Sequence, residues 1–552
     1  MRTAYTSDQI RAAEAALMAA LPEGALMERA AAGLAAVCAR MLGGTAGRVY
    51  GSRVVLLVGG GDNGGDALYA GARLAARGAR VDAVLAGSRA HPAGLAALRR
   101  AGGRVLDLRS GPVPDAGDAS AGGAAVLQDT GTGTGTVPPG TVPPGTGTGI
   151  GTGPSDGRFE RVRALTGAAD LVVDGLVGIG GTGALREPYA TLARITAETV
   201  SASGAVVAVD VPSGVDASDG RVGGEAFRAD VTVTFGALKA GLLIDPGAGH
   251  AGRVEQVDIG LGPYLPDAGV TAPTGADVAP LLPRPDARSD KYRRGVVGIA
   301  AGSRRYTGAA VLCVGGAVRG GAGMVRYAGA AEPVAGVRAR WPEAVVTELA
   351  PGEGVGGVGR VQAWVLGPGL GTDSGAFALA RSVLASDLPV LVDADGLTLL
   401  AEDRSLLRRG APVLLTPHAG ELSRLLGVDR ARIEARRLEH VRRAAAELGA
   451  TVLLKGSTTL VAQEGRPVRV NPTGSPWLAT GGTGDVLAGL AGALLAAGLD
   501  CYDAATCAAY LHGVAGQDGP LAAGDVAEAL PGVIRRVVNG LRHRDGAAKL
   551  EG

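Results

Sequence analysis

The chain has 552 residues, which is too long for one hydrophobic core of ordinary size, so two or more domains are expected. Its 54 lysines and arginines nearly balance its 53 acidic residues. This net charge of +1 gives no reason to expect nucleic acid or an anionic membrane as a partner. The four cysteines form no CxxC pair, so neither a zinc site nor a disulfide framework is predicted.

The chain carries no predicted targeting or membrane segment. Asp8 and Glu14 interrupt the N-terminal stretch where an export signal needs an unbroken apolar run. The longest apolar run starts at Val486, lies between Asp485 and Asp500, and is too short to span a bilayer. We therefore expect a buried helix there and a cytoplasmic protein.

Short runs rich in valine and leucine alternate with helical stretches rich in alanine and arginine. This pattern predicts repeated βα units and parallel sheets. Most predicted strands end in a turn rich in Gly, Asp or Thr, and the carboxyl edge of such a sheet is where ligands bind. The predicted strands are 53–58, 79–86, 170–175, 205–210 and 231–236 in the first half, and 295–302, 363–369, 389–396, 412–418 and 451–457 in the second.

Two irregular stretches set the expected domain organisation. Residues 263–290 are rich in proline and lack a periodic pattern, so they are interpreted as a linker between domains at 1–262 and 291–545. Residues of about 129–157 form a Gly/Thr/Pro repeat that cannot bury a core. We expect this repeat to be a disordered surface insertion whose deletion is tolerated.

A glycine-rich turn, "LLVGGGDNGGDALYAGARLAARG" at 56–78, joins a predicted strand to a helix in the first half. Its free backbone N–H groups at a helix N-terminus suit a diphosphate. By itself the turn favours ligand binding only weakly, because a tight βα connection also explains it.

Three later polar turns sharpen that interpretation: "VVDGLVGIGGTG" (172–183), "AVDVPSGVDASDG" (208–220) and "TFGALKAGLLIDPGAGHAG" (234–252). With the glycine turn they resemble the NAD(P)H-hydrate epimerase domain, a Rossmann-like three-layer sandwich that interconverts the epimers of hydrated NADH or NADPH. The resemblance covers 1–262 apart from the insertion.

The resemblance implies a set of site residues in the first half. The epimerisation needs a positioned carboxylate, for which Asp210 is the leading candidate. Lys239 is a weaker candidate that we interpret as a surface or phosphate-facing lysine. At Asp62 and Ala67 this sequence differs from the residues that are usual in the glycine-rich motif of the family. The implied substrate contacts are Asp62, Asn63, Gly64, Gly65, Asp66, Gly178, Ile179, Gly180, Gly181, Thr182, Gly183, Ala184 and Asp210, and the implied potassium ligands are Asn63, Asp174 and Ser213.

The second half contains "ATGGTGDVLAG" at 479–489, where a glycine loop precedes Asp485 at the start of an apolar helix. The loop amides can converge on an anion, and we expect the helix dipole to keep Asp485 ionised. A phosphoryl donor over the amides and a hydroxyl against the carboxylate would make a phosphoryl-transfer site. The alternative is an aspartate helix cap after a flexible turn.

Further motifs follow in a fixed order: "AAGSRRYTGAAVL" (300–312), "LGPGLG" (366–371), "VDADGL" (392–397), "LTPHAGEL" (415–422), "LLKGSTT" (453–459) and "NPTGSPWLATGGTGD" (471–485). Together they resemble the ADP-dependent NAD(P)H-hydrate dehydratase, a member of the ribokinase-like α/β superfamily. The resemblance implies that ADP phosphorylates the added hydroxyl of the S form and that phosphate then leaves. Asp485 would be the base and a substrate contact; Ala309, Gly369 and His418 would line the hydrate pocket; and Lys455, Gly456, Ser457, Thr458, Thr459 and Gly484 would contact ADP.

The roles of four polar residues of this half are open. Glu421 and Asp395 are weak candidates to hold Mg²⁺, directly or through water, and are equally explained as helix caps. His512 lies in an apolar helical pattern and is expected to be packed. His418 has a structural alternative, as a histidine at the end of a strand.

The two halves predict a bifunctional metabolite-repair enzyme that epimerises NADH hydrate and NADPH hydrate and dehydrates the S form, with ADP, Mg²⁺ and K⁺. One alternative is a ribokinase-like kinase of a small molecule whose phosphorylated product is stable. In a second alternative the first half is a non-catalytic binding or scaffold module. We expect a homo-oligomer, because such sheets commonly assemble symmetrically.

Overall fold

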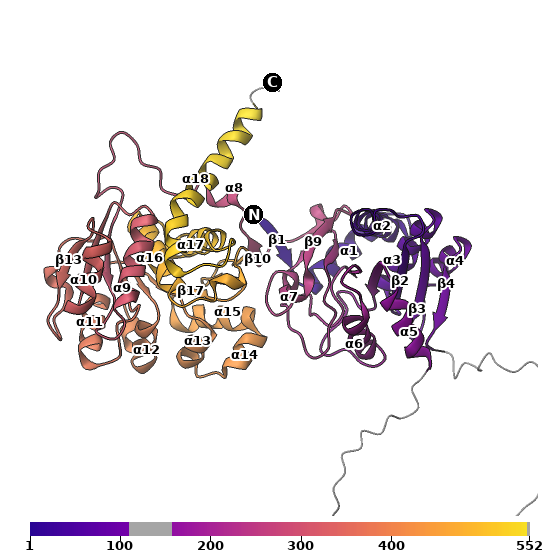
Figure 1. Cartoon of the computed structure of the whole chain (residues 1–552), viewed down its shortest axis with the longest axis horizontal. Helices are drawn as coiled ribbons and strands as arrows, with labels where there is room; N and C mark the ends of the chain where they lie inside the picture. Colours follow the sequence, from indigo (N-terminus) through magenta and orange to yellow (C-terminus); the bar gives the residue numbers. More distant parts are fainter. Residues whose placement is uncertain (110–156, 549–552) are drawn as a thin grey trace, which may run out of the picture.

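A computed structural model describes residues 1–109 and 157–548, and it describes side chains up to residue 540. Figure 1 shows two α/β bodies, one from each half of the chain, with β1 (Arg2–Tyr5) and β10 (Val270–Ala272) between them. The predicted fold class of two α/β domains is therefore confirmed. The predicted insertion at 129–157 lies outside the described residues except for Gly157, where α5 begins.

The first domain is built on a seven-stranded parallel sheet in the order β4-β3-β2-β5-β6-β7-β9. Its strands read as continuous apolar runs because both faces are buried. In β2, Val54 and Leu56 face one core cluster while Val55 and Leu57 face the other. The strands are β2 (Arg53–Val58), β3 (Arg80–Leu85), β4 (Arg104–Asp107), β5 (Leu171–Gly175), β6 (Ala205–Val209), β7 (Val231–Phe235) and β9 (Arg253–Val257).

Helices cover both faces of this sheet, which makes the predicted three-layer sandwich. Helices α1 to α4 pack on one face, and α5 and α6 pack on the other. The first-domain helices are α1 (Ser7–Met18), α2 (Ala25–Thr45), α3 (Asp62–Ala76), α4 (Pro92–Arg100), α5 (Gly157–Gly167), α6 (Tyr189–Thr199), the 3₁₀ helix η1 (Ala240–Leu242) and α7 (Ala248–Ala251).

The strand order reverses between β2 and β5. The chain leaves β2 toward β3 and β4 on one side, and then returns to β5, β6 and β7 on the other. Loops at the carboxyl ends of strands beside such a switch point form the usual ligand crevice of an open α/β sheet. The first candidate site lies at this edge.

The second domain uses a parallel core, β13-β12-β11-β14-β15-β16-β17, extended by the antiparallel strands β18 and β19. All five strands predicted in this half are present. The strands are β11 (Val296–Ala300), β12 (Met324–Gly329), β13 (Val345–Glu348), β14 (Ala363–Leu366), β15 (Val390–Val392), β16 (Val413–Leu415), β17 (Thr451–Leu454), β18 (Thr459–Ala462) and β19 (Val468–Asn471).

This second sheet is also covered on both faces. Helices α11 to α15 pack on one face, and α8, α9, α10, α16, α17 and α18 pack on the other. The helices are α8 (Gly275–Val278), α9 (Thr307–Arg319), α10 (Ala331–Arg340), α11 (Ser374–Leu384), α12 (Asp395–Glu402), α13 (Ala419–Leu426), α14 (Arg430–Ala435), α15 (Arg437–Leu448), the 3₁₀ helix η5 (Pro476–Leu478), α16 (Thr483–Ala496), α17 (Cys501–Ala515) and α18 (Ala523–Ala548).

The apolar run after Asp485 forms the buried helix α16, as predicted. It packs closely on α9 because both helices carry glycine at the contact, and a Cβ on Gly489 would lie 1.9 Å from the carbonyl oxygen of Cys313. No helix among the described residues is long and apolar enough to cross a bilayer. The close packing fixes the first turn of α16, which carries Asp485.

The second sheet continues into the first domain. β19 pairs with β10, β10 pairs with β1, and β1 pairs with the two-residue strand β8 (Leu238–Lys239). β10 and α8 fall within 263–290, the stretch that the sequence analysis treats as a linker. The amino group of Met1 also lies 2.6 Å from Oδ1 of Asp277 in α8. Backbone hydrogen bonds therefore join the two domains through one sheet.

Candidate active sites

The first candidate site forms where the loops after β2 and β5 meet. A Cβ on Gly59 would lie 1.9 Å from the carbonyl oxygen of Leu176, so only glycine allows this approach. The next turn leads into α3, which begins at Asp62. The Arg11 guanidinium of α1 donates to the carbonyl oxygen of Ile179 at 3.1 Å, which brings α1 to the second loop. Both predicted substrate loops, 62–66 and 178–184, thus lie at the switch point.

The three predicted potassium ligands come together beside these loops. The Ser213 hydroxyl donates to Oδ1 of Asp174 at 2.6 Å, and the Ser213 amide donates to Oδ2 at 2.8 Å. Asn63 lies against the same turn, because a Cβ on Gly178 would be 2.3 Å from its Oδ1. Burial raises the pKa of Asp174 to about 6, and among the described residues it forms no ion pair. The side chains of Asp174, Ser213 and Asn63 offer carboxylate, hydroxyl and amide oxygens, the ligand type that fits a hard monovalent cation.

Asp210 follows β6 and faces the same edge of the sheet. Its backbone has φ of 66°, which is unusual for a residue other than glycine. Its Oδ1 accepts hydrogen bonds from Lys239 Nζ at 2.5 Å, from the Phe235 amide at 3.1 Å and from the Thr234 hydroxyl at 3.2 Å. Strain held by several hydrogen bonds is typical of functional positions.

The interpretation of Lys239 as a surface lysine is wrong. Its side chain is fully buried, and its ammonium group donates to Asp210, to the Thr234 hydroxyl and to the Phe235 carbonyl oxygen. Lysine can be buried when a carboxylate and hydrogen-bond acceptors compensate its charge. Lys239 is therefore part of the first candidate site.

A buried carboxyl group, Asp66, and a partly buried one, Glu14, complete this site. Asp66 is 6% exposed, its Oδ1 has no hydrogen-bond partner, and burial raises its pKa well above the usual value. Glu14 was not predicted as a site residue, and burial raises its pKa to about 7 despite Lys239 nearby. Glu14 follows Ile10 by four positions in α1, so a glutamate on the apolar face of an amphipathic helix was the available signal.

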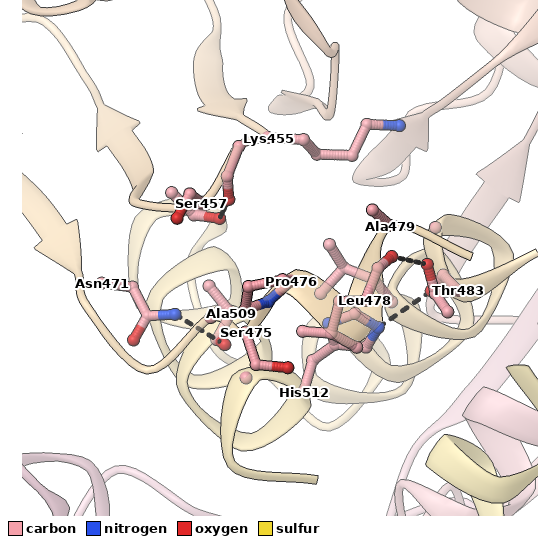
Figure 2. A pocket seen from close by; sticks show the side chains of 16 residues that line it. Lys455, Ser457, Asn471, Ser475, Pro476, Leu478, Ala479, Thr483, Ala509 and His512 are labelled. Atoms are coloured by element: carbon pink, nitrogen blue, oxygen red, sulfur yellow. Dashed lines mark hydrogen bonds between the residues drawn. The ribbon is translucent and has the colours of Figure 1, made fainter. Parts of the chain in front are cut away.

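The second candidate site is an open cavity of about 280 Å³ between the turn after β17 and the start of α16. Figure 2 shows Lys455 and Ser457 on one side of it and Leu478, Thr483 and His512 on the other. Gly484, at the start of α16, also lines the cavity. The amides of the first turn of this helix are thus next to the predicted nucleotide loop, as an anion site requires.

Asp485 directly follows Gly484 in that first turn. Burial, and after it the neighbouring carboxylate of Asp393, raises the pKa of Asp485 to about 7. The expectation that the helix dipole keeps this group firmly ionised is therefore wrong, because burial and a second carboxylate outweigh the dipole. A pKa near neutrality suits a general base at working pH.

Asp393 was missed by the sequence analysis although it lies in the quoted stretch "VDADGL". It is 1% exposed, and its Oδ1 lies 2.7 Å from Nζ of Lys455. Glu421 Oε2 lies 3.6 Å from the same ammonium group. Burial opposes the charge of Lys455, but the two carboxylates raise its pKa overall. Asp393 follows β15 directly, and that position at the carboxyl edge was the signal that could have identified it.

The predicted nucleotide loop, 455–459, divides into two parts. Lys455, Gly456, Ser457 and Thr459 line the cavity. The Thr458 side chain is buried and is bonded to Asp245 of the first domain, at 3.0 Å from Oγ1 to Oδ2. The prediction that Thr458 contacts the nucleotide thus finds no support from its side chain, which is engaged across the domain boundary.

The three predicted hydrate contacts are only partly brought together. Gly369 (φ 59°) lies against Ala309, since a Cβ on Gly369 would be 2.6 Å from that of Ala309. His418 caps α13, with its Nδ1 accepting from the Gly420 and Glu421 amides at 2.9 and 3.2 Å. Burial lowers its pKa. Its Nε2 lies 3.5 Å from Oε1 of Glu421, so His418 has a structural role at the start of α13.

The remaining polar residues have structural partners. Glu421 accepts from the His418 amide at 2.7 Å, and Asp395 accepts from the Gly371 amide at 2.8 Å. His512 is packed as expected: its Nε2 contacts the Thr483 carbonyl oxygen at 2.9 Å, and burial lowers its pKa to about 4. Among the described residues no group of three His, Cys, Asp or Glu side chains is placed to hold a metal ion.

Comparisons with known proteins cover both domains. Residues 297–531 match a family described as NAD(P)H-hydrate dehydratase. Residues 23–113 and 147–241 match a family described as the YjeF-related protein N-terminus.

Similar proteins span almost the whole chain. The bifunctional NAD(P)H-hydrate repair enzyme Nnr of Mycobacterium leprae is 44% identical over 516 residues, which are 93% of this chain and 93% of that protein. The protein of the same name from Mycobacterium tuberculosis H37Rv is 44% identical over 92% of this chain and 91% of its own length. One similar solved structure is that of the ADP/ATP-dependent NAD(P)H-hydrate dehydratase from Bacillus subtilis, co-crystallised with ATP/Mg²⁺. Its sequence is 31% identical to this chain, and the match covers 48% of this chain and 97% of that protein with a TM-score of 0.44.

The relatives span both domains and both candidate sites. This chain therefore belongs to the family of bifunctional NAD(P)H-hydrate repair enzymes.

Proposed function

We propose that the second domain dehydrates the S form of NADH hydrate and NADPH hydrate with ADP as phosphoryl donor. The observation that carries the proposal is Asp485: a carboxylate with a pKa of about 7, directly after Gly484 at the wall of the cavity. The Asp485 carboxylate takes the proton of the added hydroxyl as its oxygen attacks the β-phosphorus of ADP, and AMP leaves. Phosphate then leaves from the ring together with a proton from the neighbouring ring carbon, which restores the ring double bond, so the products are NAD(P)H, AMP, phosphate and a proton.

Lys455 and the loop amides supply the electrostatic part of this reaction. Lys455 lines the cavity and its ammonium group is held by Asp393, so the side chain is oriented before the nucleotide arrives. Mg²⁺ bound with ADP would neutralise the phosphate charge. Each candidate ligand, Asp395 and Glu421, already accepts one backbone hydrogen bond, so we propose that they act through their other oxygen or through water.

We propose that the first domain interconverts the R and S epimers, because a dehydratase limited to one epimer leaves the other unrepaired. Asp210, held by Lys239, is the proposed acid–base residue for loss and return of the hydroxyl. K⁺ would be bound by Asn63, Asp174 and Ser213, where it compensates a buried carboxylate and orders the turn beside the substrate loops.

The test uses purified protein, ADP, Mg²⁺ and a mixture of both NADH-hydrate epimers, with the return of reduced-nicotinamide absorbance as the signal. Complete recovery supports both activities. Arrest after one epimer leaves the first domain a scaffold, and phosphorylation without recovery favours the small-molecule kinase alternative. A parallel reaction with ATP in place of ADP shows which nucleotide is the phosphoryl donor.

We also propose a cytoplasmic location and a homo-oligomeric assembly. Four cysteines, all free and buried, are compatible with a reducing compartment. Light scattering coupled to size-exclusion chromatography measures the mass of the assembly. A monomeric mass would contradict the proposed homo-oligomer.

A further inference from the structure

One short segment of the first domain reaches both candidate sites. It begins with β8, where Lys239 donates to Asp210 in the first site. Six positions later, Asp245 contacts the nucleotide loop of the second domain. Between them, Leu243 and Ile244 are buried in the core cluster that holds the strands of the second domain. The segment 238–245 is therefore anchored in both domains at once.

The contact between Asp245 and Thr458 consists of three hydrogen bonds. The Thr458 amide and hydroxyl both donate to Oδ2 of Asp245, at 2.8 and 3.0 Å. In return, the Asp245 amide donates to the Thr458 hydroxyl oxygen at 3.1 Å. Thr458 is 7% exposed, so water does not easily replace these bonds. Hydrogen bonds to a charged acceptor are stronger than bonds between neutral groups.

Thr458 is the buried residue of the nucleotide loop, and it is held from two sides. Gly456 and Ser457 are exposed at the cavity, whereas Thr458 is buried behind them. From the other side, the buried Arg437 guanidinium donates through Nη2 to the carbonyl oxygens of Lys455 and Thr458, at 3.0 and 3.2 Å. The second domain thus supplies Arg437 to hold the loop carbonyls, and the first domain supplies Asp245 to hold the Thr458 amide and hydroxyl.

We infer that Asp245 is a positioning residue of the first domain for nucleotide binding in the second. It keeps the turn 455–459 in the shape that presents the Gly456 and Ser457 backbone to a nucleoside diphosphate. The inference rests on the proposed use of ADP at this cavity. It gives the fusion of the two domains a physical role beyond supplying both epimers, since the nucleotide site is complete only when the first domain is in place.

Loss of Asp245 should act on nucleotide binding more than on the chemical step. In an Asp245→Ala variant the loop keeps Arg437 but loses the bonds to the Thr458 amide and hydroxyl, so ADP must restrict a looser loop. We expect the KM for ADP to rise roughly tenfold, within the usual range of coupling between sites. The kcat for dehydration should change less than about threefold, because Asp485 and Lys455 are untouched. Epimerisation should be unchanged.

Conservative variants separate positioning from a general loss of structure. Thr458→Ser keeps the hydroxyl and should stay near the wild-type KM for ADP, whereas Asp245→Asn keeps an acceptor oxygen but not its charge and should lie between the wild type and Asp245→Ala. Thr458→Val should reproduce Asp245→Ala, and the double variant should be no worse than either, since both remove one interaction. Asp277→Ala is the matched control, because it breaks another contact across the domain boundary, that with Met1.

All variants are measured as the full chain, for ADP-dependent recovery of NADH from its S hydrate and for thermal stabilisation by ADP. A raised KM and a smaller ADP-induced shift in Tm, specific to Asp245→Ala and Thr458→Val, establish the inference. An unchanged KM in Asp245→Ala, an equal effect of Asp277→Ala, or a parallel fall of kcat in both reactions overturns it. If the wild type neither binds nor uses ADP, the proposed function fails instead, and that result is visible before any variant is compared.

Discussion

Lys239 Nζ lies 2.5 Å from Oδ1 of Asp210, and both side chains are buried at the edge of the first sheet. Removing one partner of such a pair leaves the other charge uncompensated, which typically costs about 3–5 kcal/mol. We therefore expect Lys239→Met to abolish epimerisation and to lower the thermal stability of the protein.

The double variant Lys239→Met/Asp210→Asn provides the control for that prediction. It removes both charges, so it should recover much of the lost stability while remaining inactive as an epimerase. Differential scanning fluorimetry and an epimer-resolved assay measure the two effects. Equal stability of Lys239→Met and the wild type would contradict an important role for the ion pair.

Dehydration should depend on pH through Asp485. The base must be deprotonated, so the rate is expected to rise as pH increases through the pKa of Asp485, which is about 7. Asp393→Asn removes a negative neighbour that raises this pKa, and the acid limb should then move to lower pH by about half a unit or more. The kcat/KM for S hydrate at saturating ADP measures the shift.

The exposed Asp518→Asn is the control for this profile, because it removes the same charge from a residue that does not line the cavity. An acid limb that stays in place in Asp393→Asn would argue against Asp485 as the group that titrates.

Asp485→Asn should separate activity from stability. We expect loss of dehydration by about a thousandfold or more, with ADP affinity largely retained, because the loop and Lys455 remain. Burial raises the pKa of Asp485 from 3.8 to about 7, so the wild type loses stability as pH rises across this window. The variant lacks that loss and should be more stable above pH 7, by at most about 4 kcal/mol.

The stability difference should disappear below about pH 4, where Asp485 is protonated in both the folded and the unfolded chain. Denaturant unfolding of the second domain at pH 4 and at pH 8 measures it. A variant that is less stable than the wild type at pH 8 would contradict a strained, functional carboxylate.

Potassium should stabilise the first domain. If K⁺ binds the folded chain through Asn63, Asp174 and Ser213, as proposed, it should raise the unfolding temperature of this domain and accelerate epimerisation. We expect this effect with KCl but not with LiCl at equal ionic strength, and it should be reduced in Ser213→Ala. An equal response to both salts would contradict a specific potassium site.

The sequence predicted the strands that carry the sites, because buried parallel strands are apolar on both faces and stand out as runs such as 53–58 and 451–457. It did not predict β1, β8 or β10. These strands have two to four residues, and they form only because partners far along the chain supply their hydrogen bonds. No local pattern indicates such a partner.

The site residues also divide into those that local sequence indicates and those that depend on distant contacts. The motifs, together with the family resemblance that they carry, pointed to Asp485, Asp210 and the loop at 455–459, whereas a glycine-rich turn after a strand is by itself also explained as a tight connection. Only the tertiary structure decided that Lys239 is buried against Asp210, that Asp393 orients Lys455, and that Thr458 faces the first domain. Residue types and spacing determine which chemistry is available, whereas burial and charge partners depend on contacts between residues as distant in the sequence as Asp245 and Thr458.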